Sequence, residues 1–232
     1  MQKNKSYREL QIGEIVTSDF RAAEIFTKAG IDFCCGGNKT LSVACREKEI
    51  NEENLIRQFE ELEKVPDGNT LNFKDWDLSF LADYITNTHH KYILKTLPDL
   101  LFYTRKVADV HGSHHPELVE IADLFSKINH ELLQHLQKEE DVLFPAIKEA
   151  QKSKSQYYKN IIKSETDRMW TEHEFAGGAM DKINQLSSAY LIPEDACNTY
   201  KVTLQLLQEF ENNLHIHVHL ENNILYPKAL LI

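Results

Sequence analysis

Two segments of the sequence share one pattern of metal-binding residue types. Residues 135–145 read His-Leu-Gln-Lys-Glu-Glu-Asp-Val-Leu-Phe-Pro, and residues 217–227 read His-Val-His-Leu-Glu-Asn-Asn-Ile-Leu-Tyr-Pro. Each segment contains His-x3-Glu, then two unconstrained positions, then Val or Ile, Leu, an aromatic residue and Pro. Positions i and i+4 of a helix lie on the same face, so each segment presents one imidazole and one carboxylate in the same direction. Each segment is therefore a candidate half of a metal site.

The metal-binding residues continue the apolar stripes of predicted helices. His135 with Glu139, His217 with Glu221, and His173 on a third helix all follow apolar residues at steps of three or four. We therefore expect these side chains to point into a helical core, where an unpaired carboxylate costs several kcal/mol. One His-x3-Glu is common on solvated helix faces. Two copies 82 residues apart, both on core stripes, predict a metal centre.

The spacing of the two halves indicates a fourth imidazole. His173 precedes His217 by 44 residues, and His90 precedes His135 by 45. His90 is the best match on the first long helix, but its neighbour His89 competes with it, and the sequence leaves this choice open. Four His and two Glu can hold two metals that share both carboxylates, with two imidazoles for each metal. Such a nitrogen and oxygen set suits iron, manganese or zinc rather than a thiolate site.

A second candidate site is the adjacent pair Cys34 and Cys35, which Gly36 and Gly37 follow. The two glycines predict a tight turn that leaves the thiols near open backbone. The pair does not have the spacing of zinc ligands. It is either a buried pair of small apolar residues or a thiol pair that contacts a metal, another thiol or nitric oxide. The pattern alone leaves both interpretations open.

Four long helices must position the predicted metal ligands. Apolar residues at steps of three and four predict helices over residues 77–110, 116–150 and 157–191, and a fourth that opens at Pro193. Pro98 should kink the first of them. Short loops between the helices predict an up-down-up-down bundle over residues 75–232.

Two local features of these helices admit detailed predictions. After Glu139, the core stripe should continue through Val142 and Leu143. Residues 215–219 alternate like a strand with three His on one face, but the helical period of both flanks favours a helix. On a helix, His215 and His219 lie off the core face and should be solvated or orient a ligand.

The N-terminal part predicts a separate small helical domain over residues 1–70. Short helices should begin after Thr17 or Ser18, end at Gly30, begin again at Thr40, and cover residues 52–64. The stretch Val-Pro-Asp-Gly-Asn-Thr at 65–70 is the clearest linker signal. All 11 His lie between residues 89 and 219, whereas three of the four Cys precede residue 46. The two domains are thus expected to carry different chemistries, in an all-α chain.

Composition excludes several classes of protein. Of the 232 residues, 42% are hydrophobic and 27% charged, as in an ordinary globular protein. The net charge of −10 argues against a nucleic-acid or anionic-membrane surface. The sequence has no signal-peptide pattern and no stretch near the roughly 18 apolar residues of a membrane span. Four Cys without a disulfide framework predict a cytoplasmic location.

The motifs together resemble a known family. His-x3-Glu-x3-Leu-Phe-Pro, its Leu-Tyr-Pro partner, and Glu172-His173-Glu174 on the third helix resemble hemerythrin-like di-iron bundles. Phe33-Cys-Cys-Gly-Gly37 ahead of such a bundle resembles the ScdA/YtfE-type proteins that repair iron centres. The resemblance covers nearly the whole chain, and the motifs are quite specific in combination.

The resemblance implies a fold, a cofactor and a set of site residues. It implies a hemerythrin-like four-helix bundle with two non-haem irons, bridged by oxygen (Fe–O–Fe) and carboxylates, behind a small helical N-terminal domain. The implied iron ligands are His90, His135, His173 and His217, with Glu139 and Glu221 as bridges, and Cys34 and Cys35 match the cysteine pair of the family.

The resemblance also implies a function. It implies a cytoplasmic role in repair of iron–sulfur clusters after oxidative or nitrosative stress, by iron delivery or nitric oxide handling. The expected partners are damaged iron–sulfur proteins, nitric oxide and oxygen. Nitric oxide reduction as a catalytic activity and a homodimer as the assembly stay open.

One departure from the oxygen-carrying hemerythrins helps to separate the alternatives. The third helix of those proteins carries a His-x3-His pair, but here Gly177 stands four residues after His173. One fewer imidazole favours an iron donor or a nitric oxide site over a reversible oxygen carrier. The alternatives to repair are a hemerythrin-like oxygen or redox sensor and a metal-free helical interaction protein.

Overall fold

The protein is built from helices. The computed structural model describes residues 6–65 and 71–232. Every named element in these ranges is a helix, and the only β pairing there is an isolated bridge between Gln11 and Thr40. The all-α prediction is therefore confirmed. None of the described helices is long and apolar enough to cross a membrane.

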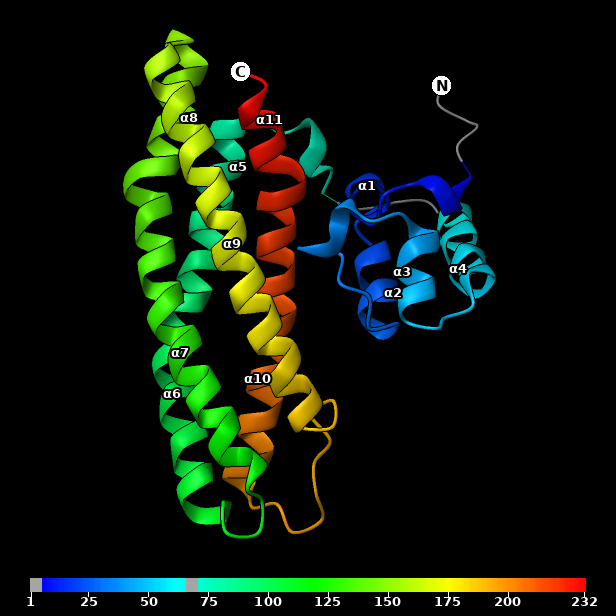
Figure 1. Cartoon of the computed structure of the whole chain (residues 1–232), viewed down its shortest axis with the longest axis vertical. Coiled ribbons are helices and arrows are strands. Elements are labelled where there is room, and N and C mark those ends of the chain that lie inside the picture. Colours follow the sequence, from blue (N-terminus) through cyan, green and yellow to red (C-terminus); the bar gives the residue numbers. More distant parts are fainter. Residues whose placement is uncertain (1–5, 66–70) are drawn as a thin grey trace. The chain divides into compact units, whose positions relative to one another are not determined.

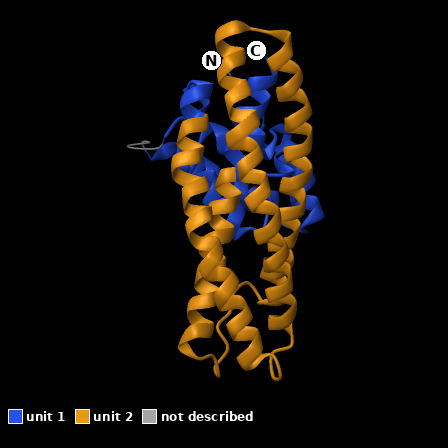
Figure 2. Ribbon diagram, turned by 90° about the vertical axis from the view of Figure 1, so that its left-hand side faces the viewer, with its two compact units in different colours: residues 1–81, 218–231 blue, residues 82–217, 232 orange. Residues whose placement is uncertain are grey.

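The chain divides into two compact units. One contains residues 1–81 and 218–231, and the other contains residues 82–217 and 232 (Figure 2). The division between 1–70 and 75–232 that the sequence suggests remains a prediction. Its linker, apart from Val65, lies at residues 66–70, outside the described residues.

Four long antiparallel helices form a bundle (Figure 1). The first is α5 (Leu78–Ile85) and α6 (Lys91–His111), the second is α7 (Glu117–Lys138) and α8 (Phe144–Ser153), the third is α9 (Gln156–Leu186), and the fourth is α10 (Asn198–Leu220) and α11 (Tyr226–Leu230). Loops join successive helices in up-down-up-down order, as predicted. The helix at residues 215–219 rules out the strand alternative.

The predicted apolar stripes form the core of the bundle. On α9, every stripe residue from Ile162 to Ile183 is buried, and on α10 the stripe is buried from Tyr200 onward. Phe125 and Phe210 meet edge to face at 5.4 Å between ring centroids. Each helix therefore uses one apolar face for burial and leaves the opposite face in water.

Three of the four long helices contain a π-helical segment, in which the turn is wider than in an α-helix. These segments are Thr86–His90, Glu139–Leu143 and Glu221–Leu225. The second one corrects the predicted stripe: Val142 is 42% exposed, whereas Leu143 and Phe144 are buried. The extra residue in the wide turn moves the core face one position along the chain.

The connection between the third and fourth helices differs from the prediction. Helix α9 ends at Leu186 instead of residue 191, and α10 begins at Asn198 instead of Pro193. The Pro193 carbonyl accepts a hydrogen bond from Ala196 N in a turn. The Cys197 sulfur accepts hydrogen bonds from the backbone N–H groups of Thr199 and Tyr200 and so caps the first turn of α10.

The smaller unit contains four short helices near the N-terminus: α1 (Ile12–Ser18), α2 (Ala22–Lys28), α3 (Leu41–Glu47) and α4 (Glu52–Lys64). They enclose a core that includes Ile12, Phe26 and Phe59. The α3 cap at Thr40, the bounds of α4 and the left-handed Gly30 (φ +64) agree with the sequence prediction. The predicted start after Thr17 or Ser18 is wrong, because these residues end the unpredicted helix α1.

Candidate metal centre

Six buried side chains form two groups of potential metal ligands. One group is His90, Glu139, His217 and Glu221, and the other is His135, Glu139, His173 and Glu221. Within each group, one nitrogen or oxygen atom from every residue lies within 4.8 Å of the others. All six residues are at most 1% exposed. The two groups share both carboxylates and have two imidazoles each, which is the arrangement that the sequence predicts.

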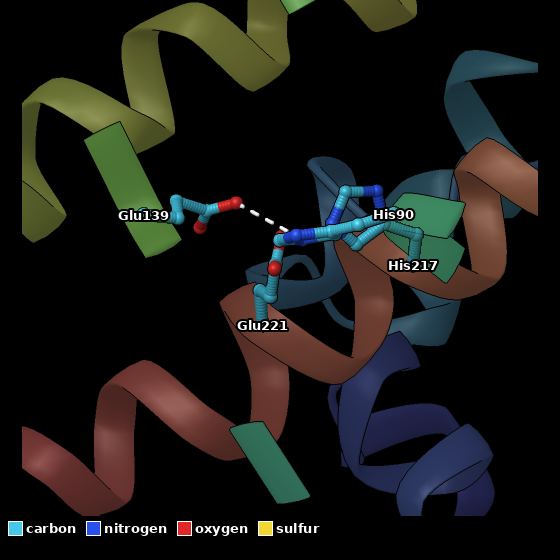
Figure 3. A group of neighbouring side chains, drawn as sticks. All are labelled: His90, Glu139, His217 and Glu221. Carbon is cyan, nitrogen blue, oxygen red and sulfur yellow. Dashed lines mark ion pairs between the residues drawn. The ribbon is translucent and has the colours of Figure 1, made fainter. Parts of the chain in front are cut away.

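The π-helical segments supply three of these side chains. His90 is the last residue of one segment, and Glu139 and Glu221 are the first residues of the other two. The helix that carries His217 runs without interruption into the segment that carries Glu221. Figure 3 shows the side chains of the first group converging, with His90 Nε2 at 3.4 Å from Glu139 Oε2. On the other side of Glu139, His135 Nε2 lies 3.2 Å from the same oxygen atom.

The geometry separates the two neighbouring histidines of the first helix. His90 belongs to a ligand group, whereas His89 belongs to neither. His89 Nδ1 lies 3.2 Å from Asn213 Oδ1, and its ring stacks on that of His217 with 5.9 Å between centroids. His89 is 4% exposed, so burial alone does not distinguish the two residues. The two residues differ in the direction in which their side chains leave the helix.

Two further carboxylates orient the imidazoles. His90 Nδ1 donates to Glu140 Oε1 at 2.8 Å, and His135 Nδ1 donates to Glu172 Oε2 at 2.9 Å. A neutral imidazole that donates through Nδ1 has its lone pair on Nε2, and the Nε2 atoms of both rings face Glu139. The hydrogen bond from His135, and an ion pair with Lys138, lower the pKa of the Glu172 carboxyl to about 2.

The donor set fits a pair of metal ions. Two carboxylates and four imidazoles meet in a core from which water is excluded, and buried carboxylates need compensating positive charge. The Nε2 atoms of His135 and His173 approach to 3.1 Å, so both rings direct a nitrogen toward one point. Mixed nitrogen and oxygen ligands with carboxylates shared between two groups suit first-row metals. The six residues are therefore chemically competent to bind two cations.

The cysteine pair lies in a turn that an aspartate holds. Asp32 Oδ1 accepts hydrogen bonds from Cys34 N at 2.9 Å, Cys34 Sγ at 3.0 Å and Cys35 N at 3.0 Å. Its other oxygen accepts from Gly36 N at 2.8 Å. Cys34 is buried and Cys35 is partly exposed. A hydrogen bond to Cys35, burial and the Asp32 charge raise the pKa of Cys34, so this residue is a thiol at neutral pH.

The cysteine turn contacts the segment that follows Glu221, within the smaller unit. Asn223 Nδ2 donates to the Cys34 carbonyl at 3.0 Å. A Cβ atom at Gly13 or at Gly37 would lie 2.4 Å from Asn223 Oδ1, so both glycines are needed for this close approach. His219 is fully buried, with Nδ1 at 3.4 Å from the Phe33 carbonyl, and burial lowers its pKa to about 4.

Several of these residues were not predicted from the sequence. His219 was expected to be solvated or to orient a ligand, but Phe20 and Phe33 pack against its ring. Asp32 and Asn223 were not anticipated. The position of Asp32, two residues before the first amide that it binds, is typical of an Asx turn and is a signal that could have found it. The contact of Asn223 is made across 189 residues and has no comparable local signal.

Comparison with known proteins agrees with this arrangement. Residues 81–229 match the hemerythrin HHE cation binding domain, and residues 8–63 match ScdA_N, a domain of unknown function. The iron-sulfur cluster repair protein ScdA of Staphylococcus epidermidis is 35% identical over 219 residues, which cover 94% of this chain and 96% of that protein. The iron-sulfur cluster repair protein YtfE of Pectobacterium atrosepticum is 33% identical over 228 residues, 97% of this chain and 98% of that protein.

These matches extend over nearly the full length of the chain. They combine the cysteine-containing N-terminal domain with the cation-binding bundle in the same order as the relatives. The chain belongs to the ScdA/YtfE family of iron–sulfur cluster repair proteins, with a hemerythrin HHE domain.

Proposed function

We propose that this protein supports the repair of damaged iron–sulfur clusters and that its buried centre holds two non-haem irons. The observation that carries this proposal is the pair of ligand groups that share Glu139 and Glu221. The names of the relatives, which describe iron–sulfur cluster repair proteins, support the same function for this chain. The proposed ligands are His90 and His217 for one iron, His135 and His173 for the other, and both carboxylates for both.

The donor set favours a centre that exchanges ligands and metal. Each group supplies four side chains, whereas iron commonly takes more ligands, so each metal keeps a position for a small molecule. When bound, the irons supply redox chemistry and binding of a diatomic molecule such as nitric oxide or oxygen. Because Glu139 and Glu221 belong to both ligand groups, two imidazoles and both carboxylates would remain for one iron if the other were lost. We infer that iron can leave as cargo without collapse of the site.

The protein contributes orientation and exclusion of water. Glu140 and Glu172 hold the Nδ1 protons of His90 and His135, so the Nε2 lone pairs stay directed at the centre. Phe144 stacks on His90 at 5.5 Å between centroids and covers it with apolar surface. These contacts orient the rings of His90 and His135 and fix their tautomers before metal binds.

We assign Cys34 and Cys35 to the encounter with the damaged cluster. The Asp32 turn presents Cys35 toward solvent while it holds Cys34 as a buried thiol. Cys35 is then the residue that first contacts the cluster or takes up iron. The damaged iron–sulfur protein and nitric oxide are the proposed partners, in the cytoplasm, and nitric oxide reduction and a homodimer remain predictions.

Metal analysis and a repair assay test this proposal together. The protein as purified should contain about two irons per chain, and it should restore activity to an iron–sulfur enzyme that nitric oxide has inactivated. Glu221→Gln should lose iron and repair activity. Glu209→Gln, an exposed change of the same charge on α10, should retain both and serves as the control.

The alternatives predict other results. A stable and reversible oxygen adduct that does not depend on Cys34 or Cys35 would indicate an oxygen or redox sensor. A protein without metal, whose melting temperature is unchanged by chelators, would be a helical interaction protein. Full repair activity in an iron-free Glu221→Gln variant would contradict the proposal.

A further inference from the structure

A third cluster of metal-ligand residue types lies on the bundle, apart from the centre described above. Asp181 on α9 and Glu211 and His215 on α10 each offer one ligand atom, and these atoms lie within 4.8 Å of one another. None of the three belongs to the two central groups. His215 and His217 are two residues apart on a helix, so their side chains diverge by about 200° around its axis. The cluster therefore faces away from the central site.

Glu211 is the unusual member of this cluster. It is 6% exposed, and burial raises the pKa of its carboxyl although the His215 charge and hydrogen bonds from Asn184 and Tyr190 act in the opposite direction. In the part of the chain that the structure describes, no lysine or arginine forms an ion pair with Glu211. Two carboxylates close together, one of them buried, repel each other unless a cation lies between them.

The surroundings hold Glu211 in place. Asn184 Nδ2 donates a hydrogen bond to Glu211 Oε2 at 3.0 Å. Tyr190 is buried beside it, and burial and the Glu211 charge raise the pKa of its phenol. Metal-binding sites typically contain neighbouring side chains that hydrogen-bond to a metal ligand, because these bonds fix the orientation of the carboxylate.

The backbone after α9 is strained at this position. Ser188, Ala189 and Tyr190 all have positive φ, at 51°, 58° and 61°. Three consecutive residues other than glycine in the left-handed region cost free energy, and such conformations persist only where the surroundings hold them. Here Tyr190 N donates to Ser187 Oγ and Ala189 N donates to the Asn184 carbonyl. The strained turn thus holds Tyr190 near Glu211.

We propose that Asp181, Glu211 and His215 form a third metal site, which binds a divalent first-row cation such as manganese(II) or iron(II). Two carboxylates and one imidazole are a donor set that these ions accept. Three protein ligands leave coordination positions open for water, unlike the closed ligand sets of structural sites. Asp181 is exposed and Glu211 is buried, so the cation enters from solvent and ends on the inner carboxylate. The proposal goes beyond cluster repair and does not depend on it.

Manganese(II) titration of the iron-loaded full-length protein tests this site. Free manganese(II) gives a strong electron paramagnetic resonance signal, which decreases when the ion binds. We expect one further equivalent to bind to the wild type. Asp181→Asn and Glu211→Gln should each weaken this binding about 10-fold or more. Asp167→Asn is the matched control, because it makes the same change at an exposed position of α9 and should bind like the wild type.

Iron content, measured before and after the titration, separates this site from the central one. Retention of all iron while manganese binds supports an additional site, whatever the function of the centre. The proposal is overturned if the wild type binds no further manganese, if manganese displaces iron one for one, or if Asp181→Asn binds like the wild type. Because Asp181 is exposed, its variant keeps the test valid even if Glu211→Gln fails to fold.

Discussion

Glu139 is the residue whose loss should affect both metals at once. It belongs to both ligand groups, its Oε2 faces the Nε2 atoms of His90 and His135, and it is fully buried. Glu139→Gln keeps the shape of the side chain but removes the charge that both cations need. His173→Ala removes a ligand of one group only. We therefore expect Glu139→Gln to lose both metals and His173→Ala to retain one.

The loss of both metals from Glu139→Gln should also lower the temperature of thermal unfolding. A metal at about 100 times its Kd stabilises the folded state by about 2.7 kcal/mol. For a chain of this size, 1 kcal/mol corresponds to about 2–4 °C in Tm, so each lost metal lowers the Tm by about 5–11 °C. The metal-loaded Glu139→Gln variant should melt lower than the wild type by roughly twice that amount. In the metal-free proteins the difference in Tm should be much smaller, because neither protein has bound metal to lose.

The assay combines calorimetry with metal analysis, each with and without a chelator. Glu131→Gln is the control, because it removes one exposed carboxylate from the same helix, α7. Its metal content and Tm should match those of the wild type. If Glu139→Gln retained two metals per chain and the wild-type Tm, the shared-carboxylate arrangement would be refuted.

Three further predictions follow from other parts of the bundle. His90→Ala should lower the metal content, whereas His89→Ala should not, because only His90 belongs to a ligand group; metal analysis of both variants checks this. Cys197 should be alkylated by iodoacetamide at neutral pH much faster than the buried Cys34, and His111→Ala should slow the reaction. Backbone N–H groups and His111 lower the pKa of Cys197 and so enrich the thiolate, whereas the pKa of Cys34 is raised; equal rates by peptide mapping would contradict this. Glu211 has a raised pKa, so its contribution to stability is present below its unfolded-state pKa and is lost as the pH rises through the folded-state value. Glu211→Gln should therefore make the metal-free protein more stable at neutral pH but not at acidic pH, and an unchanged pH profile of unfolding would exclude this reasoning.

Helix periodicity predicted most of the fold. The stripes of α9 and α10 have one residue in every three or four buried over their whole length, and no other secondary structure fits that period. Local capping residues were also informative. Asn51 and Thr40 accept hydrogen bonds from the first turns of α4 and α3, which is why the sequence placed both starts correctly.

The errors lie where tertiary contacts override local preference. Helix α1 was missed because its seven residues carry too few turns for a clear period. The left-handed residues Ser188, Ala189 and Tyr190 have no sequence signal, since glycine normally occupies such positions. A turn there ends α9 earlier than its polar and apolar pattern suggested.

The central site was more predictable than its surroundings. The two His-x3-Glu motifs and the apolar stripe of the third helix indicated five of the six residues that meet in the core, and the matching spacing favoured His90 as the sixth. The choice between His89 and His90 required the direction of each side chain, which a one-residue difference in helical register decides. Contacts such as that between Asn223 and Cys34 connect distant parts of the chain, and only the folded structure brings them together.

The three π-helical segments make the length of each helix part of the site. A π segment amounts to one residue inserted into an α-helix, and each residue turns the helix by about 100°. Removing a single residue from Glu139–Leu143 would restore a regular helix and keep Phe144 on the core face, because the wide turn absorbs the extra residue. Insertions and deletions in the regular helix on either side would instead rotate everything after them by about 100° and should be far less tolerated than substitutions. The number of residues between each carboxylate and the proline that follows it, Glu139 to Pro145 and Glu221 to Pro227, therefore determines which side chains face the core.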